Sequence, residues 1–281
     1  MNSSIPPPDR VLPRLLAAWP LVAVALAGTL NATPLRAQNT PAVRADLQVL
    51  STQRIFLGHQ SVGDNLLDGV RQLARDAQVP LTVTEFDSAA QIDAPVLGHT
   101  HVAENTQPLK KLKSFEQAMG AQSAKLDLAM LKFCYIDFQA GTDVKQLFGE
   151  YQRTVDRIRT AHPKLKLLHI TTPLTTVQSG WKVSLKKLVG KAPYGLLENL
   201  KREEYNQLLR QTYGPLGSVF DLARTEATQP DGRLWTQHWN GVDVPSLYPP
   251  YSDDGEHLNA TGQVHVATEF LRVAARQVGK P

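Results

Sequence analysis

Two polar stretches near opposite ends of the chain hold a serine and a carboxylate–histidine pair. Ser61 follows the run RIFLGHQ at residues 54–60, and Asp254 lies three residues before His257. A carboxylate that pairs with an imidazole fixes the ring tautomer, so that the other ring nitrogen can act as a base. If the fold brings this pair to Ser61, the serine hydroxyl can act as a nucleophile towards a carbonyl carbon.

Ser61 stands between a predicted strand and a predicted helix. Ile55–Leu57 is a short apolar run that stops at Gly58, which is typical of a buried strand. Residues 62–77 then place their apolar side chains at helical spacing. The free backbone N–H groups at the start of such a helix can stabilise an oxyanion. The alternative is that Ser61 is only a helix cap, with Asp64 completing the cap.

Together the two stretches resemble the SGNH, or GDSL-like, hydrolase superfamily, over about residues 54–278. The closest match is the last block, DGEHLNATG at 254–262. In the first block Ser61 matches, whereas His59 and Gln60 stand in place of the single acid of Gly-Asp-Ser. The chain therefore resembles a divergent member of this superfamily, with Gly-His-Gln-Ser in place of Gly-Asp-Ser.

The resemblance implies a serine esterase with a catalytic triad and without a cofactor. Ser61 would attack the carbonyl of a small acyl ester, His257 would take the serine proton, and Asp254 would orient His257. Export and aromatic loops favour acylated, for example acetylated, carbohydrate as the substrate. Two other functions stay open: an acyltransferase of the same fold that acts on a polysaccharide, and a non-catalytic carbohydrate-binding relative.

The family's third block, which normally supplies an oxyanion-stabilising asparagine, has no counterpart in the expected position. The corresponding stretch, residues 128–137, contains no asparagine. The oxyanion hole must therefore be incomplete or built from other groups. The candidates are Ser61 at the helix start, Gly98 and Asn105.

Strand and helix patterns alternate along the chain, which predicts a parallel sheet with helices on both faces. The resemblance implies the same architecture, a three-layer α/β/α, flavodoxin-like domain with about five strands. No repeat or low-complexity segment interrupts it. The expected strands lie at 55–57, 81–86, 125–133, 164–174 and 218–223, and the expected helices at 62–77, 143–162, 196–214 and 264–278.

The stretch from Gly98 to Pro108 is polar and lacks periodicity, so we expect a functional loop there. His99, His101 and Glu104 within it could bind a metal ion. Because no further ligand follows at a fixed spacing, we expect no metal site.

Two insertions, at 175–193 and 224–251, are expected to face the site. The second is rich in Pro and Gly and dense in aromatic residues. These aromatic rings could stack on sugar rings or line an acyl pocket, or they could pack the loop onto the domain, and the sequence leaves both open. The candidates for substrate binding are His59, Trp235, Trp239 and Tyr251.

Residues 1–37 have the layout of a secretory signal peptide. Arg10 and Arg14 precede an apolar run, and small residues lead to a cleavage position after Ala37. An uncleaved N-terminal anchor is the alternative. We expect cleavage, which leaves residues 38–281 as one domain that is periplasmic or secreted and has no stable membrane span.

The charge balance argues against nucleic acid as a partner. The formal net charge is +4, and the signal segment carries three arginines and one aspartate, so its removal lowers the net charge to about +2. A basic stripe on one element would be expected of a nucleic-acid-binding protein. The expected partner is a small-molecule or saccharide ester, and the oligomeric state stays open. Cys134 is the only cysteine, so the core must supply the stability without a disulfide.

Overall fold

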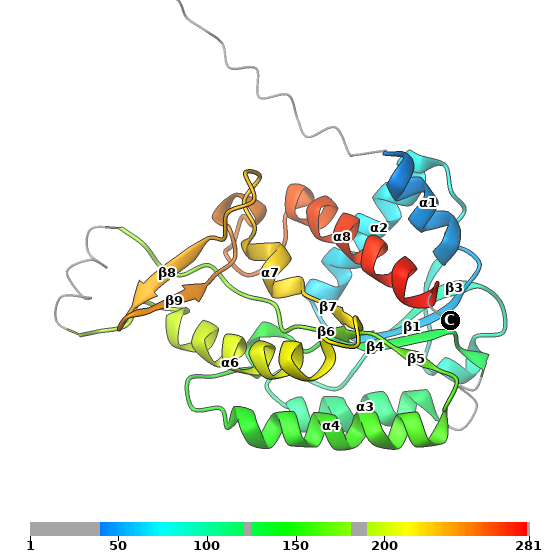
Figure 1. The fold of residues 1–281 in the computed structure, drawn as a ribbon, viewed down its shortest axis with the longest axis horizontal. Helices are drawn as coiled ribbons and strands as arrows, with labels where there is room; N and C mark the ends of the chain where they lie inside the picture. The colour runs from blue at the N-terminus through cyan, green and yellow to red at the C-terminus, as the bar shows by residue number, and fades with distance from the viewer. Residues whose placement is uncertain (1–39, 121–124, 181–189, 280–281) are drawn as a thin grey trace, which may run out of the picture. The chain divides into compact units, whose positions relative to one another are not determined.

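A parallel five-stranded sheet carries the strand before Ser61 in its middle (Figure 1). The computed structural model describes residues 40–120, 125–180 and 190–279, so the expected signal peptide at 1–37 lies outside the described residues. In spatial order the strands are β2 (Val83–Glu85), β3 (Val96–His101), β1 (Arg54–His59), β4 (Leu128–Leu131) and β5 (Lys166–Leu167).

Strand β1 pairs in parallel with β3 on one side and with β4 on the other. Near its end, Gly58 lies opposite Thr100 of β3 and Leu131 of β4. Parallel strands bring their carboxyl ends to the same edge of a sheet, which is where ligands bind in open α/β folds. Ser61, which follows β1, therefore emerges in the middle of that edge.

Helices cover both faces of the sheet (Figure 1). Helices α1, α2 and α8 pack against one another on one face, and α3, α4 and α6 pack on the other. The helices are α1 (Pro41–Leu50), α2 (Val62–Ala77), α3 (Pro108–Met119), α4 (Val144–Ala161), α6 (Leu196–Tyr213), α7 (Leu222–Ala227) and α8 (Ala260–Val278), with 3₁₀ turns η1 (Ala89–Gln91), η3 (Tyr135–Asp137) and η4 (Pro249–Tyr251).

The side chains of β1 alternate between two hydrophobic cores. Ile55 and Leu57 belong to the core with α1, α2 and α8, whereas Phe56 belongs to the core with α3, α4 and α6. Because both faces are buried, the strand is apolar throughout rather than alternating. The predicted three-layer α/β/α class with a parallel sheet of about five strands is confirmed.

The predicted loop from Gly98 to Pro108 is wrong in its first half. Residues up to His101 form the end of β3, and only Val102–Gln107 connects to α3. The polar GHTH stretch looked like a loop because its histidines interrupt the apolar pattern. Polar side chains can be buried in a strand when they find partners, and His99 lies 3.0 Å from His59 inside the sheet. The expected strand at 81–86 is reduced to the three-residue edge strand β2.

The expected strands at 164–174 and 218–223 are much shorter than predicted. The first is split into β5 and β6 (His169–Ile170), and β6 pairs with β7 (Val219–Phe220). Strand β7 ends early because the Asp221 side chain accepts a hydrogen bond from the backbone N–H of Arg224. This N-cap starts α7 where the sequence pattern predicted more strand.

The insertion at 224–251 was predicted to be loop-like, and this is wrong as well. It contains the end of α7 and an antiparallel hairpin of β8 (Thr236–Trp239) and β9 (Val242–Pro245). The turn is Asn240-Gly241, with a positive φ at both residues, which is the strongest short hairpin signal in a sequence. The other insertion, 175–193, lies partly outside the described residues.

The predicted helices agree closely with the structure. Helices α2, α4 and α6 match their expected ranges to within one residue at each end. Helix α8 begins four residues earlier than expected, because Asn259 caps it by accepting from the backbone N–H of Gly262. Helix α1 was not predicted. In the part of the chain that the structure describes, no helix combines the length and the apolar character needed to cross a membrane.

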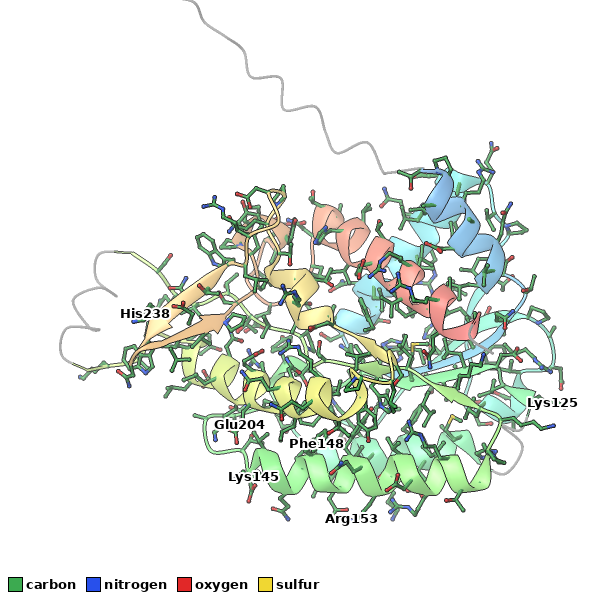
Figure 2. The ribbon with its side chains drawn as sticks, viewed as in Figure 1. Lys125, Lys145, Phe148, Arg153, Glu204 and His238 are labelled. Carbon is green, nitrogen blue, oxygen red and sulfur yellow. The ribbon has the colours of Figure 1, made fainter. Side chains whose placement is uncertain are left out.

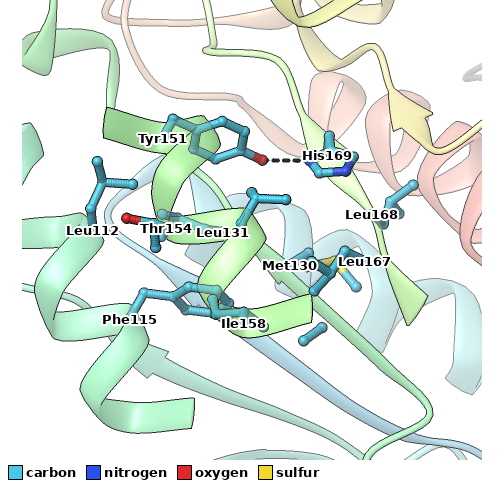
Figure 3. Close-up of a pocket in the computed structure, with 12 residues that line it drawn as sticks. Leu112, Phe115, Met130, Leu131, Tyr151, Thr154, Ile158, Leu167, Leu168 and His169 are labelled. Carbon is cyan, nitrogen blue, oxygen red and sulfur yellow. Dashed lines mark hydrogen bonds between the residues drawn. The ribbon is translucent and has the colours of Figure 1, made fainter. Parts of the chain in front are cut away.

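A small cavity of about 20 Å³ lies between the sheet and helices α3 and α4 (Figure 3). Its lining is mostly apolar, and the hydroxyl of Tyr151 lies 2.7 Å from Nδ1 of His169 at its border. A volume of this size holds about one water molecule. The cavity is therefore a packing feature and not a substrate site.

The close packing of α2 on α8 gives a prediction about stability. A Cβ at Gly69 would overlap the Gln263 carbonyl and the Cβ of Ala267 in α8, so Gly69→Ala should destabilise the domain by about 1–3 kcal/mol. Gly149→Ala is the matched control, because only the flexible Arg153 side chain approaches that position, at 3.7 Å. That substitution should be neutral or stabilising. Urea denaturation of both variants tests this, and equal stabilities would contradict it.

Candidate active site

Ser61, His257 and Asp254 form a hydrogen-bonded chain at the carboxyl edge of the sheet. The Oγ of Ser61 lies 2.8 Å from Nε2 of His257, and Nδ1 of His257 lies 2.7 Å from Oδ2 of Asp254. With Nδ1–H donating to the carboxylate, Nε2 is free to accept the serine proton. The geometry is that of a nucleophile, a base and an orienting acid.

The backbone at Ser61 has an unusual conformation. Its φ of 46° and ψ of −98° fall outside the favoured regions for a residue with a side chain. Its side chain makes no capping hydrogen bond to α2, so it does not act as the N-cap that sequence alone allowed. Strained residues of this kind concentrate at functional sites, and this one turns its hydroxyl towards His257.

The carboxylate of Asp254 is held by its own loop. Its Oδ1 accepts hydrogen bonds from the backbone N–H groups of Glu256, at 2.8 Å, and His257, at 2.7 Å. Partial burial would raise the pKa of Asp254, but these bonds and the His257 ring outweigh it and hold the pKa below its ordinary value. The group is therefore ionised at neutral pH and can stabilise a charged imidazole.

The loop that carries His257 is fastened to both flanking helices. The backbone N–H of Leu258 donates to Oδ1 of Asn65 in α2, at 3.1 Å. Asn259 caps α8 and donates its side-chain amide to Asp253, at 3.0 Å. Because α2 begins directly after Ser61, the contact through Asn65 fixes His257 relative to Ser61.

Tyr135, from the turn after β4, lies beside the base. Its ring meets the His257 ring edge-on with centroids 5.8 Å apart, and its hydroxyl donates to Glu256 at 2.8 Å. The buried guanidinium of Arg202 donates to the Tyr135 carbonyl at 3.0 Å. No role for Tyr135 or Arg202 was predicted from the sequence. The available signal was a tyrosine after the end of a predicted strand.

A buried lysine contacts the residue before Ser61. The ammonium of Lys132 donates to the carbonyl of Gln60 at 2.6 Å, directly before Ser61. Burial lowers the pKa of Lys132 to about 8, and the buried carboxyl of Glu226 partly opposes that shift. The side-chain amide of Gln60 donates to the carbonyls of Val102 and Ala103, so it ties the β1 end to the loop after β3. The contacts of Lys132 and Gln60 were not predicted from the sequence.

The oxyanion candidates separate in the structure. Gly98 lies within β3 opposite Phe56, well before the strand end, so the structure does not place it beside Ser61. Asn105 lies in the loop after β3, and its side-chain oxygen accepts from Lys111 at 2.9 Å. This leaves the Asn105 amide –NH₂ group for another partner. None of the described residues accepts a hydrogen bond from the backbone N–H of Ser61.

Two of the four substrate-binding candidates are buried. His59 is fully buried in β1, and desolvation lowers its pKa far below the ordinary value. Tyr251 is 3% exposed and donates its hydroxyl to the Thr228 carbonyl, so its ring packs the insertion onto the domain. Trp235 and Trp239 are half-buried. Only the two tryptophans retain surface that a ligand could contact.

The three possible metal ligands suggested by the sequence, His99, His101 and Glu104, do not gather around one point. Glu104 is exposed and accepts from the Gln107 amide at 2.9 Å. His99 turns Nδ1 towards Nε2 of His59. Among the residues that the structure describes, a different group has its possible ligand atoms within 4.8 Å of one another, and that group is His59, Asp64 and His101.

The buried carboxyl group behind the site predicts a pH dependence of stability. Burial raises the pKa of Glu226 from 4.5 to about 8. Between these values the unfolded chain releases a proton that the folded protein keeps, so stability should fall as pH rises from about 4.5 to about 8. Glu226→Gln should reduce that slope by up to about 1.4 kcal/mol per pH unit. Urea denaturation at a series of pH values measures it, and parallel profiles for wild type and variant would contradict it.

The chain matches no known family model and no curated protein. Solved structures similar to it in fold include an acetylxylan esterase from Geobacillus stearothermophilus, at 14% identity and TM-score 0.45, over 83% of this chain and 97% of the esterase. Another is the periplasmic domain of a lipopolysaccharide acetyltransferase from Salmonella ser. Paratyphi A (14%, 0.42, 83% and 87%). A third is a family 3 carbohydrate esterase from Clostridium thermocellum (13%, 0.37, 79% and 98%). Each likeness concerns the fold alone.

Proposed function

We propose that this chain is an exported serine esterase that hydrolyses small acyl esters. The observation that carries the proposal is the unbroken hydrogen-bonded chain from Ser61 through His257 to Asp254. A serine hydroxyl is a weak nucleophile unless a positioned base takes its proton. Here the base is in place, oriented by an ionised carboxylate.

The reaction proceeds in two halves. The Oγ of Ser61 forms a bond to the ester carbonyl carbon while Nε2 of His257 takes the hydroxyl proton. The imidazolium then gives that proton to the departing alcohol, and the acyl group stays on Ser61. Water then attacks the acyl carbon while Nε2 of His257 takes one of its protons. The bond between Oγ and the acyl carbon breaks, the imidazolium returns the proton to Oγ, and the acid leaves. Asp254 stays ionised throughout and stabilises the imidazolium.

The oxyanion donors proposed here are the backbone N–H of Ser61 and the side-chain amide of Asn105. Asn105 lies on the loop to which Gln60 is hydrogen-bonded through Ala103. Its orientation is fixed by Lys111, whose ammonium also pairs with the fully buried Asp137 at 2.7 Å. Asn105 would then do the work of the asparagine that is missing after β4. Donors fixed before the reaction stabilise the developing charge without reorganisation.

The acyl group and the alcohol are proposed from the sequence. The signal-like N-terminus supports an extracytoplasmic substrate, and acetylated saccharide is the first to test. Trp235 and Trp239 are the rings that remain for contact with it. The side chains of Asp254 and His257 are both exposed, which suits an ester on a large, solvated molecule.

The nucleophile can be tested without knowing the substrate. A fluorophosphonate should label the wild-type protein once, with an Oγ–P bond at Ser61 and loss of fluoride. Ser61→Ala should abolish labelling and keep the thermal midpoint, because the Ser61 side chain makes no capping bond. Ser51→Ala, at an exposed serine at the end of α1, is the matched control and should label normally. Intact-mass and peptide mapping measure this; wild type that stays unlabelled would favour a non-catalytic domain.

The acid and base can be tested with 4-nitrophenyl acetate. His257→Ala should lower kcat/KM by roughly three orders of magnitude or more. Asp254→Asn should also be strongly damaging, because an amide cannot stabilise the imidazolium. Asp253→Asn is the control and should cost far less, since the Asp253 carboxylate accepts from Asn259 instead. The reverse order of the two aspartates would overturn the assignment. An added saccharide acceptor that becomes acetylated would indicate acyl transfer.

A further inference from the structure

A cluster of histidines and carboxylates lies next to the nucleophile but outside the proposed triad. His59 and His101 end the neighbouring strands β1 and β3, where they lie opposite each other in the register. Their ring centroids are 4.8 Å apart. Asp64, in the first turn of α2, places a carboxylate oxygen 3.2 Å from Nε2 of His101. Three elements thus bring two imidazoles and a carboxylate to one point.

The buried ring of His59 has one nitrogen without a partner. Its Nε2 lies 3.0 Å from Nδ1 of His99, whereas its Nδ1 is buried and has no hydrogen-bond partner. The side of the ring that carries this nitrogen packs against Gly63 at the start of α2, since an added Cβ there would overlap Nδ1 and the carbon atoms beside it. A buried polar atom left unpaired costs free energy, and such exceptions need an explanation.

Ion pairing explains only part of this cluster. A protonated His101 between Asp64 and Glu85, at 3.2 and 2.7 Å, would be satisfied without any ligand. It would leave Nδ1 of His59 unpaired. It would also place the positive charge of His101 beside the His59 ring, without a hydrogen bond between the two rings. The ion pairs therefore leave the most buried member of the cluster unexplained.

We propose that His59, His101 and Asp64 bind a divalent transition-metal ion of the zinc type. Nδ1 of His59, Nε2 of His101 and a carboxylate oxygen of Asp64 would be the ligands, and their possible ligand atoms lie within 4.8 Å of one another. Tetrahedral zinc with bonds of 2.0–2.1 Å needs ligand atoms about 3.4 Å apart. The exposed side chains of Asp64 and His101 can close that difference, while the buried His59 stays in place.

The outer contacts of the cluster are those that metal-binding histidines make. A ligating imidazole usually donates its second N–H to a carboxylate or another acceptor, which fixes the tautomer. Nδ1 of His101 faces Glu85, and Nε2 of His59 faces His99. In the bound state both second nitrogens would carry the proton and donate it outwards. Nothing in this inference depends on the proposed esterase activity.

The bound ion would stabilise the turn that contains Ser61. His59 lies two residues before the serine and Asp64 three residues after it. A bond network from β1 and β3 to the first turn of α2 would oppose relaxation of the strained backbone at Ser61. We therefore expect metal to act on stability, by binding the folded chain and not the unfolded one.

Zinc binding and thermal stability of the purified protein test the proposal. After chelation and equilibrium dialysis against zinc, wild type should hold one equivalent at the site, and its thermal midpoint should rise by roughly 5 °C or more at 100 times Kd. His101→Gln and Asp64→Asn, both at exposed ligands, should weaken binding at least tenfold and lose the thermal shift. Circular dichroism without metal verifies that they fold.

His238→Gln is the matched control. His238, on the hairpin away from the sheet edge (Figure 2), also pairs with a carboxylate, Asp243 at 2.9 Å, but it has no place in the cluster. It should bind zinc as wild type does. Cobalt in place of zinc gives a second readout, since a tetrahedral site produces visible absorption that both ligand variants should lose. Equal zinc binding by wild type, His101→Gln and Asp64→Asn would overturn the proposal, as would wild type that takes up no zinc.

Discussion

The hydrogen bond from the Lys132 ammonium to the carbonyl of Gln60 is the contact on which the site depends. The Gln60 carbonyl accepts two hydrogen bonds, one from the Lys132 ammonium at 2.6 Å and one from the backbone N–H of Gly63 at 3.0 Å. Together these bonds hold the residue before Ser61 in place, and the one from the ammonium is charge-assisted. Burial of the ammonium is itself costly, and it lowers the pKa of Lys132 to about 8. The chain therefore leaves its central strand in one direction, and the strained turn at Ser61 follows.

The same constraint links segments that are distant in sequence. Gln60 reaches from β1 to the loop after β3, and Asn65 reaches from α2 to the loop before α8. The buried ammonium of Lys111 in α3 joins Asn105 of the loop after β3 to Asp137 of the turn after β4. Each of these contacts starts within a few residues of the sheet edge. Base, nucleophile and proposed oxyanion donors are thus held by polar side chains that are themselves satisfied, which is what a preorganised site requires.

The turn at Ser61 belongs to both proposed sites, the esterase site and the metal site, and neither proposal depends on the other. On one side it presents the hydroxyl to His257, and on the other it sets Asp64 beside His101. The proposed esterase site needs groups that pass a proton from one to the next, and the proposed metal site needs the unpaired ring nitrogen of His59. Since α2 carries Ser61 at its start, Asp64 in its first turn and Asn65 next to it, the orientation of this one helix decides both arrangements.

The sequence by itself determined the layered α/β class, the main helices and the triad residues as candidates. Periodicity is a local property, and residues 62–77 carry it without reference to the rest of the chain. The motif around His257 also contains the partner of this histidine, Asp254, three residues earlier in the sequence. Strand β3 could not be predicted, because its buried histidine, His99, is stable only beside partners from β1 and α2. The roles of His59 and Tyr251 were likewise decided by burial, which depends on the neighbours that folding supplies. What joins Ser61 to His257 is a contact across 196 positions, and only tertiary packing brings such groups together.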